Sequence, residues 1–317
     1  MRKAFMIGLA ATTALALSAA DAQTLRERFR ARFAEQAAGA EANAPAPATA
    51  QTIAYGRDPL QVLDFWPAVQ RFSTTEKFRD ARPAPLIVYV HGGGWQRGSK
   101  DSATGRWKPA HYPQEGYAFA SINYRLVPAA RVEDEATDVA LAVKALVDRA
   151  ASLGVDPHRI VLMGHSAGAH LVALVGTDER YLKAAGLSFA DLAGVIPIDG
   201  AAYDVPAQMT DGPRIMQETY GQAFGTDPAR QRALSPSLQA ATPNAAAFLL
   251  LHVQRPDGVR QAEALDAALK AAGTRVERRA FPGTGLAGHM EINRRLGDPG
   301  YAATGAVDAW LKQLFGR

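Results

Sequence analysis

The chain has 317 residues, of which 48% are hydrophobic and 21% are charged. This is the composition of a globular protein, and it excludes a disordered, collagen-like or coiled-coil chain. Lysine and arginine number 35 against 31 acidic residues, and the net charge of +4 is too small and too dispersed to indicate nucleic-acid binding. Because cysteine is absent, the chain has no disulfide, thiolate metal site or cysteine nucleophile.

The first 22 residues have the pattern of an export signal. Arg2 and Lys3 precede an uncharged apolar stretch over residues 4–20. The run Ala20-Asp21-Ala22 then fits a cleavage site before Gln23. The sequence therefore predicts export to the periplasm or the medium, between which it does not distinguish. The expected mature protein has no stable membrane span, whereas an uncleaved anchor is the alternative.

Residues 23–50 differ in composition from the rest of the chain. Leu25, Phe29 and Phe33 recur at helical spacing among arginines, and a tract rich in Ala and Pro follows. We expect a short solvated helix and a flexible linker. The alternative is a basic amphipathic helix that contacts a membrane surface, but three apolar residues give little membrane affinity.

From residue 51 to the C-terminus, short apolar segments alternate with helical patterns, which is typical of an α/β domain with a mostly parallel sheet. The expected strands are residues 52–55, 61–65, 86–90, 117–123, 159–163, 194–198, 246–251 and 276–281, and the expected helices are residues 132–151, 166–175, 261–272 and 304–315. Residues 201–244 contain no clear strand. They are expected to form a small insertion, as a lid or side wall, over the carboxyl edge of the sheet, with surface filler as the alternative.

A serine lies in a tight turn between a predicted strand and a predicted helix. The turn is Gly164-His165-Ser166-Ala167-Gly168, and such a turn points the serine hydroxyl out of the sheet edge. Glycines two residues to either side avoid a collision in the strained backbone. The pattern predicts that Ser166 is a nucleophile.

Three glycines follow the strand predicted at residues 86–90, within His91-Gly92-Gly93-Gly94-Trp95. Such a loop lets backbone amides face an oxyanion, so we expect Gly93, Gly94 and Ala167 to donate to a tetrahedral intermediate. A phosphate loop is the alternative, but no Lys-Ser or Lys-Thr pair follows at the required spacing.

A nucleophilic serine needs a base and a carboxylate that orients the base. His289 is the favoured base among seven histidines, since it lies in a predicted Gly-rich loop after the last strand. His165 is expected to flank the site. Asp257 follows the strand at residues 246–251 and is the favoured acid, and Asp199, just past residues 194–198, is the alternative. The order Ser166, Asp257, His289 is that of α/β-hydrolases.

With these motifs, the sequence resembles α/β-hydrolase esterases of the hormone-sensitive-lipase-like and feruloyl-esterase-like group, which are related to kynurenine formamidases. The resemblance begins near Tyr55 and includes the segment 123–126 (Asn-Tyr-Arg-Leu) and the pair Gly288-His289. One departure affects the acid: the group usually has His-Gly-x-x-Asp, whereas residues 252–257 are one residue longer and lack that glycine.

The resemblance implies an α/β-hydrolase fold over residues 51–317, with a sheet of about eight strands. It implies hydrolysis of carboxylic esters, either short-chain or linked to aryl groups or sugars, through an acyl-enzyme, with no cofactor and no metal. Trp95, His165 and Tyr124 are candidate substrate-binding residues, although Trp95 and Tyr124 could equally be wall packing. An arylformamidase-type amidase is the alternative activity. A serine peptidase and a non-catalytic binding module are weaker alternatives. Acyl length and oligomeric state stay open.

Overall fold

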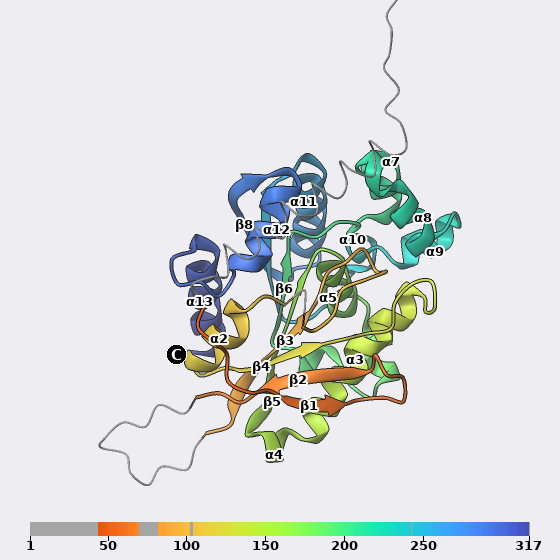
Figure 1. Cartoon of the computed structure of the whole chain (residues 1–317). Coiled ribbons are helices and arrows are strands. Elements are labelled where there is room, and N and C mark those ends of the chain that lie inside the picture. The colour runs from red at the N-terminus through yellow and green to blue at the C-terminus, as the bar shows by residue number, and fades with distance from the viewer. Residues whose placement is uncertain (1–43, 70–81, 102–103, 242, 317) are drawn as a thin grey trace, which may run out of the picture. The chain divides into compact units, whose positions relative to one another are not determined.

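The computed structural model describes residues 44–69, 82–101, 104–241 and 243–316 (Figure 1). The predicted signal peptide and the predicted basic helix lie outside these residues. The end of the predicted linker lies within them and contacts the domain: Trp66 Nε1 donates to the carbonyl of Ala48 at 2.8 Å.

One eight-stranded sheet forms the centre of the fold, in the order β1-β2-β4-β3-β5-β6-β7-β8. Strands β1 and β2 run antiparallel to their neighbours, and the other pairs are parallel. This confirms the predicted α/β-hydrolase sheet. The strands are β1 (Gln51–Ala54), β2 (Val62–Trp66), β3 (Ala84–Val90), β4 (Ala118–Ile122), β5 (Val155–His165), β6 (Gly194–Ile198), β7 (Ala247–Gln254) and β8 (Arg275–Thr284).

Helices cover both faces of the sheet, and the alternation of side chains along the strands separates two apolar layers. On β3, Leu86 and Val88 join the layer under α3, α5 and α11, whereas Ile87 and Tyr89 join the layer under α2, α12 and α13. The helices and turns are α2 (Trp107–Gln114), α3 (Val132–Asp148), α4 (Ala150–Leu153), α5 (Ala167–Thr177), α6 (Glu179–Ala184), η1 (Phe189–Asp191), α7 (Val205–Asp211), η2 (Arg214–Met216), α8 (Gln217–Phe224), α9 (Pro228–Ala233), α10 (Pro236–Gln239), α11 (Pro256–Ala271), α12 (Gly285–Arg295) and α13 (Ala302–Phe315).

Several helices differ from the expectation. Helices α2 and α6 were not expected, and α11 begins at Pro256 rather than at residue 261. The segment that carries His289 is helix α12 rather than a loop, since β8 continues to Thr284 and the helix begins at the next residue. The insertion at residues 201–244 is mostly helical, and Figure 1 shows α7, α8 and α9 grouped at one side of the sheet.

The parallel strands end at a common edge, where ligands bind in open α/β sheets. Strands β3, β5, β6, β7 and β8 are consecutive neighbours. The residues that directly follow them are therefore brought together. They are His91, Ser166, Asp199, Arg255 and the start of α12.

Candidate active site

Ser166 occupies a strained turn between β5 and α5. Its φ of 57° and ψ of −118° are unusual for a residue with a side chain. Glycine is required on both sides of it: a Cβ on Gly164 would lie 2.3 Å from the carbonyl oxygen of Gly168, and one on Gly168 would lie 2.1 Å from that of Val90. The predicted strand–turn–helix context is confirmed.

The Gly-rich loop of residues 91–95 lies against this turn. A Cβ on Gly92 would approach the Cβ of Ser166 to 2.9 Å. Gly93 and Gly94 have φ values of 134° and 62°, in the region that favours glycine. The loop thus brings the backbone of the expected oxyanion donors close to Ser166, and Ala167 follows the serine as the first residue of α5.

Trp95 and Tyr124 are buried side chains that fix the conformation of this loop. Trp95 is 2% exposed, and its Nε1 donates to His170 Nδ1 at 3.3 Å. Tyr124 has no exposed surface, stacks on His91 and donates to the His91 carbonyl at 2.7 Å. The expectation that they bind substrate therefore does not fit the structure, because both rings are enclosed by packing; the wall-packing alternative fits.

His165 is likewise not a substrate-facing residue. It is 3% exposed, and its Nε2 donates to the backbone carbonyl of His289 at 2.9 Å. The two imidazole rings have centroids 4.4 Å apart. Burial, followed by the proximity of His289, lowers the pKa of His165 well below its ordinary value. A neutral His165 thus holds the backbone of α12 at His289.

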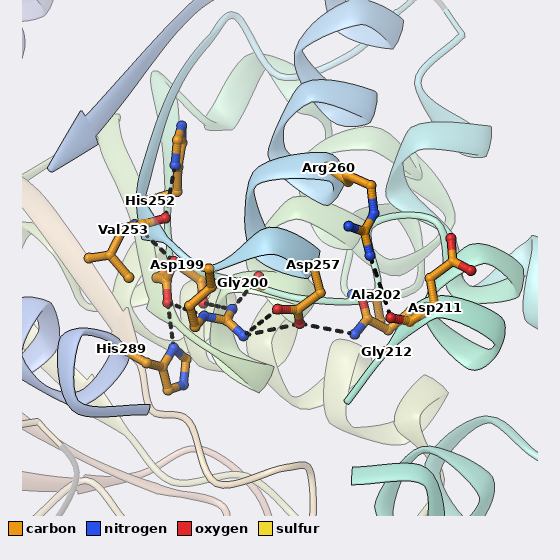
Figure 2. A network of polar contacts seen from close by, with 12 residues as sticks. Asp199, Gly200, Ala202, Asp211, Gly212, His252, Val253, Asp257, Arg260 and His289 are labelled. Atoms are coloured by element: carbon orange, nitrogen blue, oxygen red, sulfur yellow. Dashed lines mark hydrogen bonds and ion pairs between the residues drawn. The ribbon is translucent and has the colours of Figure 1, made fainter. Parts of the chain in front are cut away.

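The carboxylate partner of His289 is Asp199. The Nδ1 of His289 donates to Asp199 Oδ2 at 2.6 Å, as Figure 2 shows. Asp199 has no exposed side-chain surface, and its Oδ1 accepts from the backbone amide of Val253 at 3.0 Å. The preference for Asp257 over Asp199 is thus corrected: the runner-up occupies the position that orients the imidazole.

Asp257 is engaged elsewhere. It lies in the first turn of α11, where Arg255 Nη1 donates to it at 3.1 Å and Gln208 Nε2 donates at 3.3 Å. It also lines a pocket of about 110 Å³ together with residues of α7 and α11. The sequence pattern could not separate the two acids, because both follow strands at the same edge. The sequence held one signal for the acid, since Asp199 follows β6 with no residue between them.

The charge of Asp199 is stabilised by its neighbours. Burial alone would raise its pKa, but the hydrogen bond from His289 and the guanidinium of Arg255 hold the pKa of Asp199 well below its ordinary value. Arg255, which the sequence analysis did not single out, donates from Nε to the same Oδ2 at 2.8 Å. The carboxylate is therefore ionised and fixed for orienting the imidazole.

The helical insertion forms a wall beside the Gly-rich loop. A Cβ on Gly94 would lie 3.0 Å from Thr219 Cγ2 and 3.8 Å from Met216 Cε. Trp95 packs edge-on against Phe224 at 4.8 Å, and Gln96 donates to Gln222 at 2.9 Å. The loop and α8 are thus joined, as expected for a side wall.

Metal ligation is not indicated in the described part of the chain, where no group of three or more His, Asp or Glu side chains could hold an ion. Within these same residues, no helix is long and apolar enough to cross a membrane.

Comparison with known proteins finds esterases among the relatives of the segment that includes this edge. The BD-FAE family model matches residues 76–202, which include both the Gly-rich loop and Ser166. Esterase LipC of Mycobacterium tuberculosis is 34% identical over 135 residues, 41% of this chain and 30% of the relative. A probable isoprenylcysteine alpha-carbonyl methylesterase of Oryza sativa subsp. japonica is 31% identical over 137 residues, 43% of this chain and 30% of the relative.

Among solved structures, Esterase B from Lactobacillus rhamnosis superimposes with a TM-score of 0.67 and 21% identity, covering 94% of this chain and 99% of that chain. This likeness shows the α/β-hydrolase fold. The chain spans less than a third of the length of the two curated relatives named. Together the findings confirm the predicted resemblance to esterases of this fold.

Proposed function

We propose that this protein hydrolyses carboxylic esters through an acyl-enzyme on Ser166. The observation that carries the proposal is the convergence at one sheet edge of the strained Ser166, the Gly-rich loop and the His289–Asp199 pair. This is the constellation of nucleophile, oxyanion donors, base and orienting acid that serine hydrolases use.

In the proposed reaction, His289 takes the proton of Ser166 as the serine oxygen attacks the ester carbonyl. The amides of Gly93, Gly94 and Ala167 stabilise the oxyanion that forms. His289 then protonates the leaving alcohol, and the acyl group stays on Ser166. A water molecule, deprotonated by His289, attacks the acyl-enzyme and releases the carboxylic acid and the free serine. Asp199 keeps the imidazole oriented and stabilises its charged form. The route uses no cofactor.

The substrates we propose are small esters with short acyl chains. Thr219 and Met216 lie next to Gly94 and limit the space beside this proposed oxyanion donor. The insertion is also too charged to form a continuous apolar funnel for a long chain. Its charged residues are Asp204, Asp211, Arg214, Glu218, Asp227, Arg230 and Arg232.

The test is kcat/KM for nitrophenyl esters from acetyl to palmitoyl. We expect a maximum at or below about six carbons, and replacement of Met216 by Ala should move it to longer chains. A maximum at eight carbons or more, with activation at an oil–water interface, would contradict the proposed size limit. Hydrolysis of an aryl formamide faster than any ester would favour the amidase alternative.

Export is a second part of the proposal and is supported by the signal-like pattern of residues 1–22. Expression of the full chain in a bacterium, followed by N-terminal sequencing of the mature protein, is the measurement. We expect Gln23 as the first residue of a protein found outside the cytoplasm. A protein that keeps residues 1–22 in the cytoplasmic fraction would overturn this part alone.

A further inference from the structure

We propose that Arg255 is a positioning residue that fixes the Asp199 carboxylate for His289 and sets the lower pH limit of activity. The inference rests on the proposed function, since it assigns a task to a side chain behind the His289–Asp199 pair.

The contacts of Arg255 join the orienting acid to the insertion. Its Nε donates to Asp199 Oδ2, the oxygen that also accepts from His289. Its Nη2 donates to the backbone carbonyls of Asp199 and Gly200 at 3.3 and 3.2 Å. Its Nη1 donates to Asp257 at 3.1 Å. One planar guanidinium therefore holds both the side chain and the backbone of Asp199, whose φ is a strained 44°.

The local sequence is adapted to this arrangement. Arg255 is the residue before the first turn of α11, and its side chain makes no hydrogen bond to the helix N-terminus, which leaves the guanidinium for Asp199. Pro256 begins the helix without requiring a backbone donor. A Cβ on Gly258 would lie 2.9 Å from Arg255 Nη2, so the absence of a side chain there leaves room for the guanidinium. Asp257 in turn accepts from Gln208 of α7. Figure 2 shows the polar contacts of Asp257 and the hydrogen bond between His289 and Asp199.

The arrangement has an electrostatic consequence for His289. Arg255 is 12% exposed, so its charge is only weakly screened by solvent. The Asp199 carboxylate attracts positive charge on the imidazole, whereas the Arg255 guanidinium beside it repels such charge. Removal of the guanidinium removes this repulsion, so we expect activity to begin at a higher pH in a variant that lacks it.

Other charged and titratable groups lie on the elements packed around this pair. His165 of β5 contacts His289, and Tyr203 after β6 and Tyr301 before α13 interact electrostatically with Asp199. Asp257 of α11 interacts with Arg255, and Lys108 of α2 interacts with His165. Arg255 donates a hydrogen bond directly to the Asp199 carboxylate. Removal of the Arg255 guanidinium is therefore expected to change the pH profile of activity more than removal of any other of these groups.

The experiment measures the pH dependence of kcat/KM for a short nitrophenyl ester. Its acid limb, the range in which kcat/KM rises with pH, reports the base of the free enzyme. Arg255→Met should move the acid limb up by about one pH unit and lower kcat at the optimum about tenfold. Arg255→Lys keeps the charge but loses the planar fork, so it should lower kcat while leaving the limb within about 0.3 units of wild type.

Two further variants distinguish this role from mere packing. The double variant Arg255→Met, Asp257→Asn avoids leaving Asp257 unpaired if the single variant does not fold, and it should shift the limb in the same direction. Arg230→Met removes a comparable ion pair, with Glu133, away from the site, and it should leave the limb in place.

An acid limb that stays within 0.3 units of wild type in folded Arg255→Met or in the double variant would overturn the inference. An equal shift in Arg230→Met would do the same. Failure of the proposed function is distinguishable, because wild type itself would then show no hydrolysis that depends on Ser166.

Discussion

At the residue scale, the position of Asp199 determines how His289 can act. A carboxylate on Nδ1 directs the proton of the neutral ring to that nitrogen and leaves Nε2 as the basic atom. Asp199 is buried, accepts from His289 and Arg255, and is held by the Val253 amide. These contacts leave the carboxylate little freedom to rotate away from the imidazole.

We therefore expect Asp199→Asn to lower kcat by about 10⁴-fold, because an amide misdirects the imidazole tautomer and does not stabilise its charged form. Asp257→Asn should cost less than about tenfold, since this residue contacts the imidazole only through Arg255 and Asp199. Steady-state kinetics measures kcat of both variants, and circular dichroism verifies that both are folded. The reverse order of losses would restore Asp257 as the acid.

The sequence predicted Ser166 and His289 as the nucleophile and base, because local motifs mark such residues. The acid could not be chosen in the same way. Asp199 and Asp257 both follow strands of the parallel sheet, and only the course of the chain after β7 separates them. Arg255 takes the place beside Asp199, and α11 begins at the next residue, which turns Asp257 toward α7.

At the element scale, the site depends on the close approach of α5 to the end of β3. Gly168 lies where a Cβ would overlap the backbone of Val90 and His91, at 2.1 and 2.6 Å from their carbonyl oxygens. Backbone cannot yield as a flexible side chain can, so a larger residue must displace the helix that follows Ser166.

Gly168→Ala is accordingly expected to lower the free energy of unfolding by at least about 2–3 kcal/mol. Gly305→Ala in α13 is the matched control: no atom lies within 4 Å of the added Cβ, so it should raise the free energy of unfolding by about 0.5–1 kcal/mol. Urea denaturation measures both. Equal stability of the two variants would refute the close packing described.

Strands were more predictable than the helices around the site. Buried strands such as β3 and β6 are continuous apolar runs, which the sequence displays directly. Helix α12 was predicted as a loop because Pro282, Gly283, Gly285 and Gly288 resemble turn signals. Gly283 and Gly285 do have positive φ values, but they serve the junction between β8 and the helix.

At the scale of the whole molecule, three buried histidines link stability to pH. Burial lowers the pKa of His91 and of His170 to about 4, and burial together with the proximity of His289 lowers the pKa of His165 well below its ordinary value. In the unfolded chain these groups titrate near 6.5. Since the unfolded state binds more protons below that pH, stability must fall as the pH decreases.

We expect the free energy of unfolding to decrease between pH 7 and pH 5 by about 1–2 kcal/mol for each buried histidine. Urea denaturation at several pH values measures the slope, and the exposed His158 supplies a control, because His158→Gln should leave the slope unchanged. Constant stability over this range would mean that the three imidazoles are charged or solvated in the folded protein.

If Ser166 is the nucleophile of an ester hydrolase, replacing it by alanine must remove turnover of a short nitrophenyl ester. We expect kcat of Ser166→Ala to be about a millionfold below that of wild type, with an unchanged circular dichroism spectrum. A correctly folded Ser166→Ala protein with turnover near that of wild type would contradict this role of Ser166.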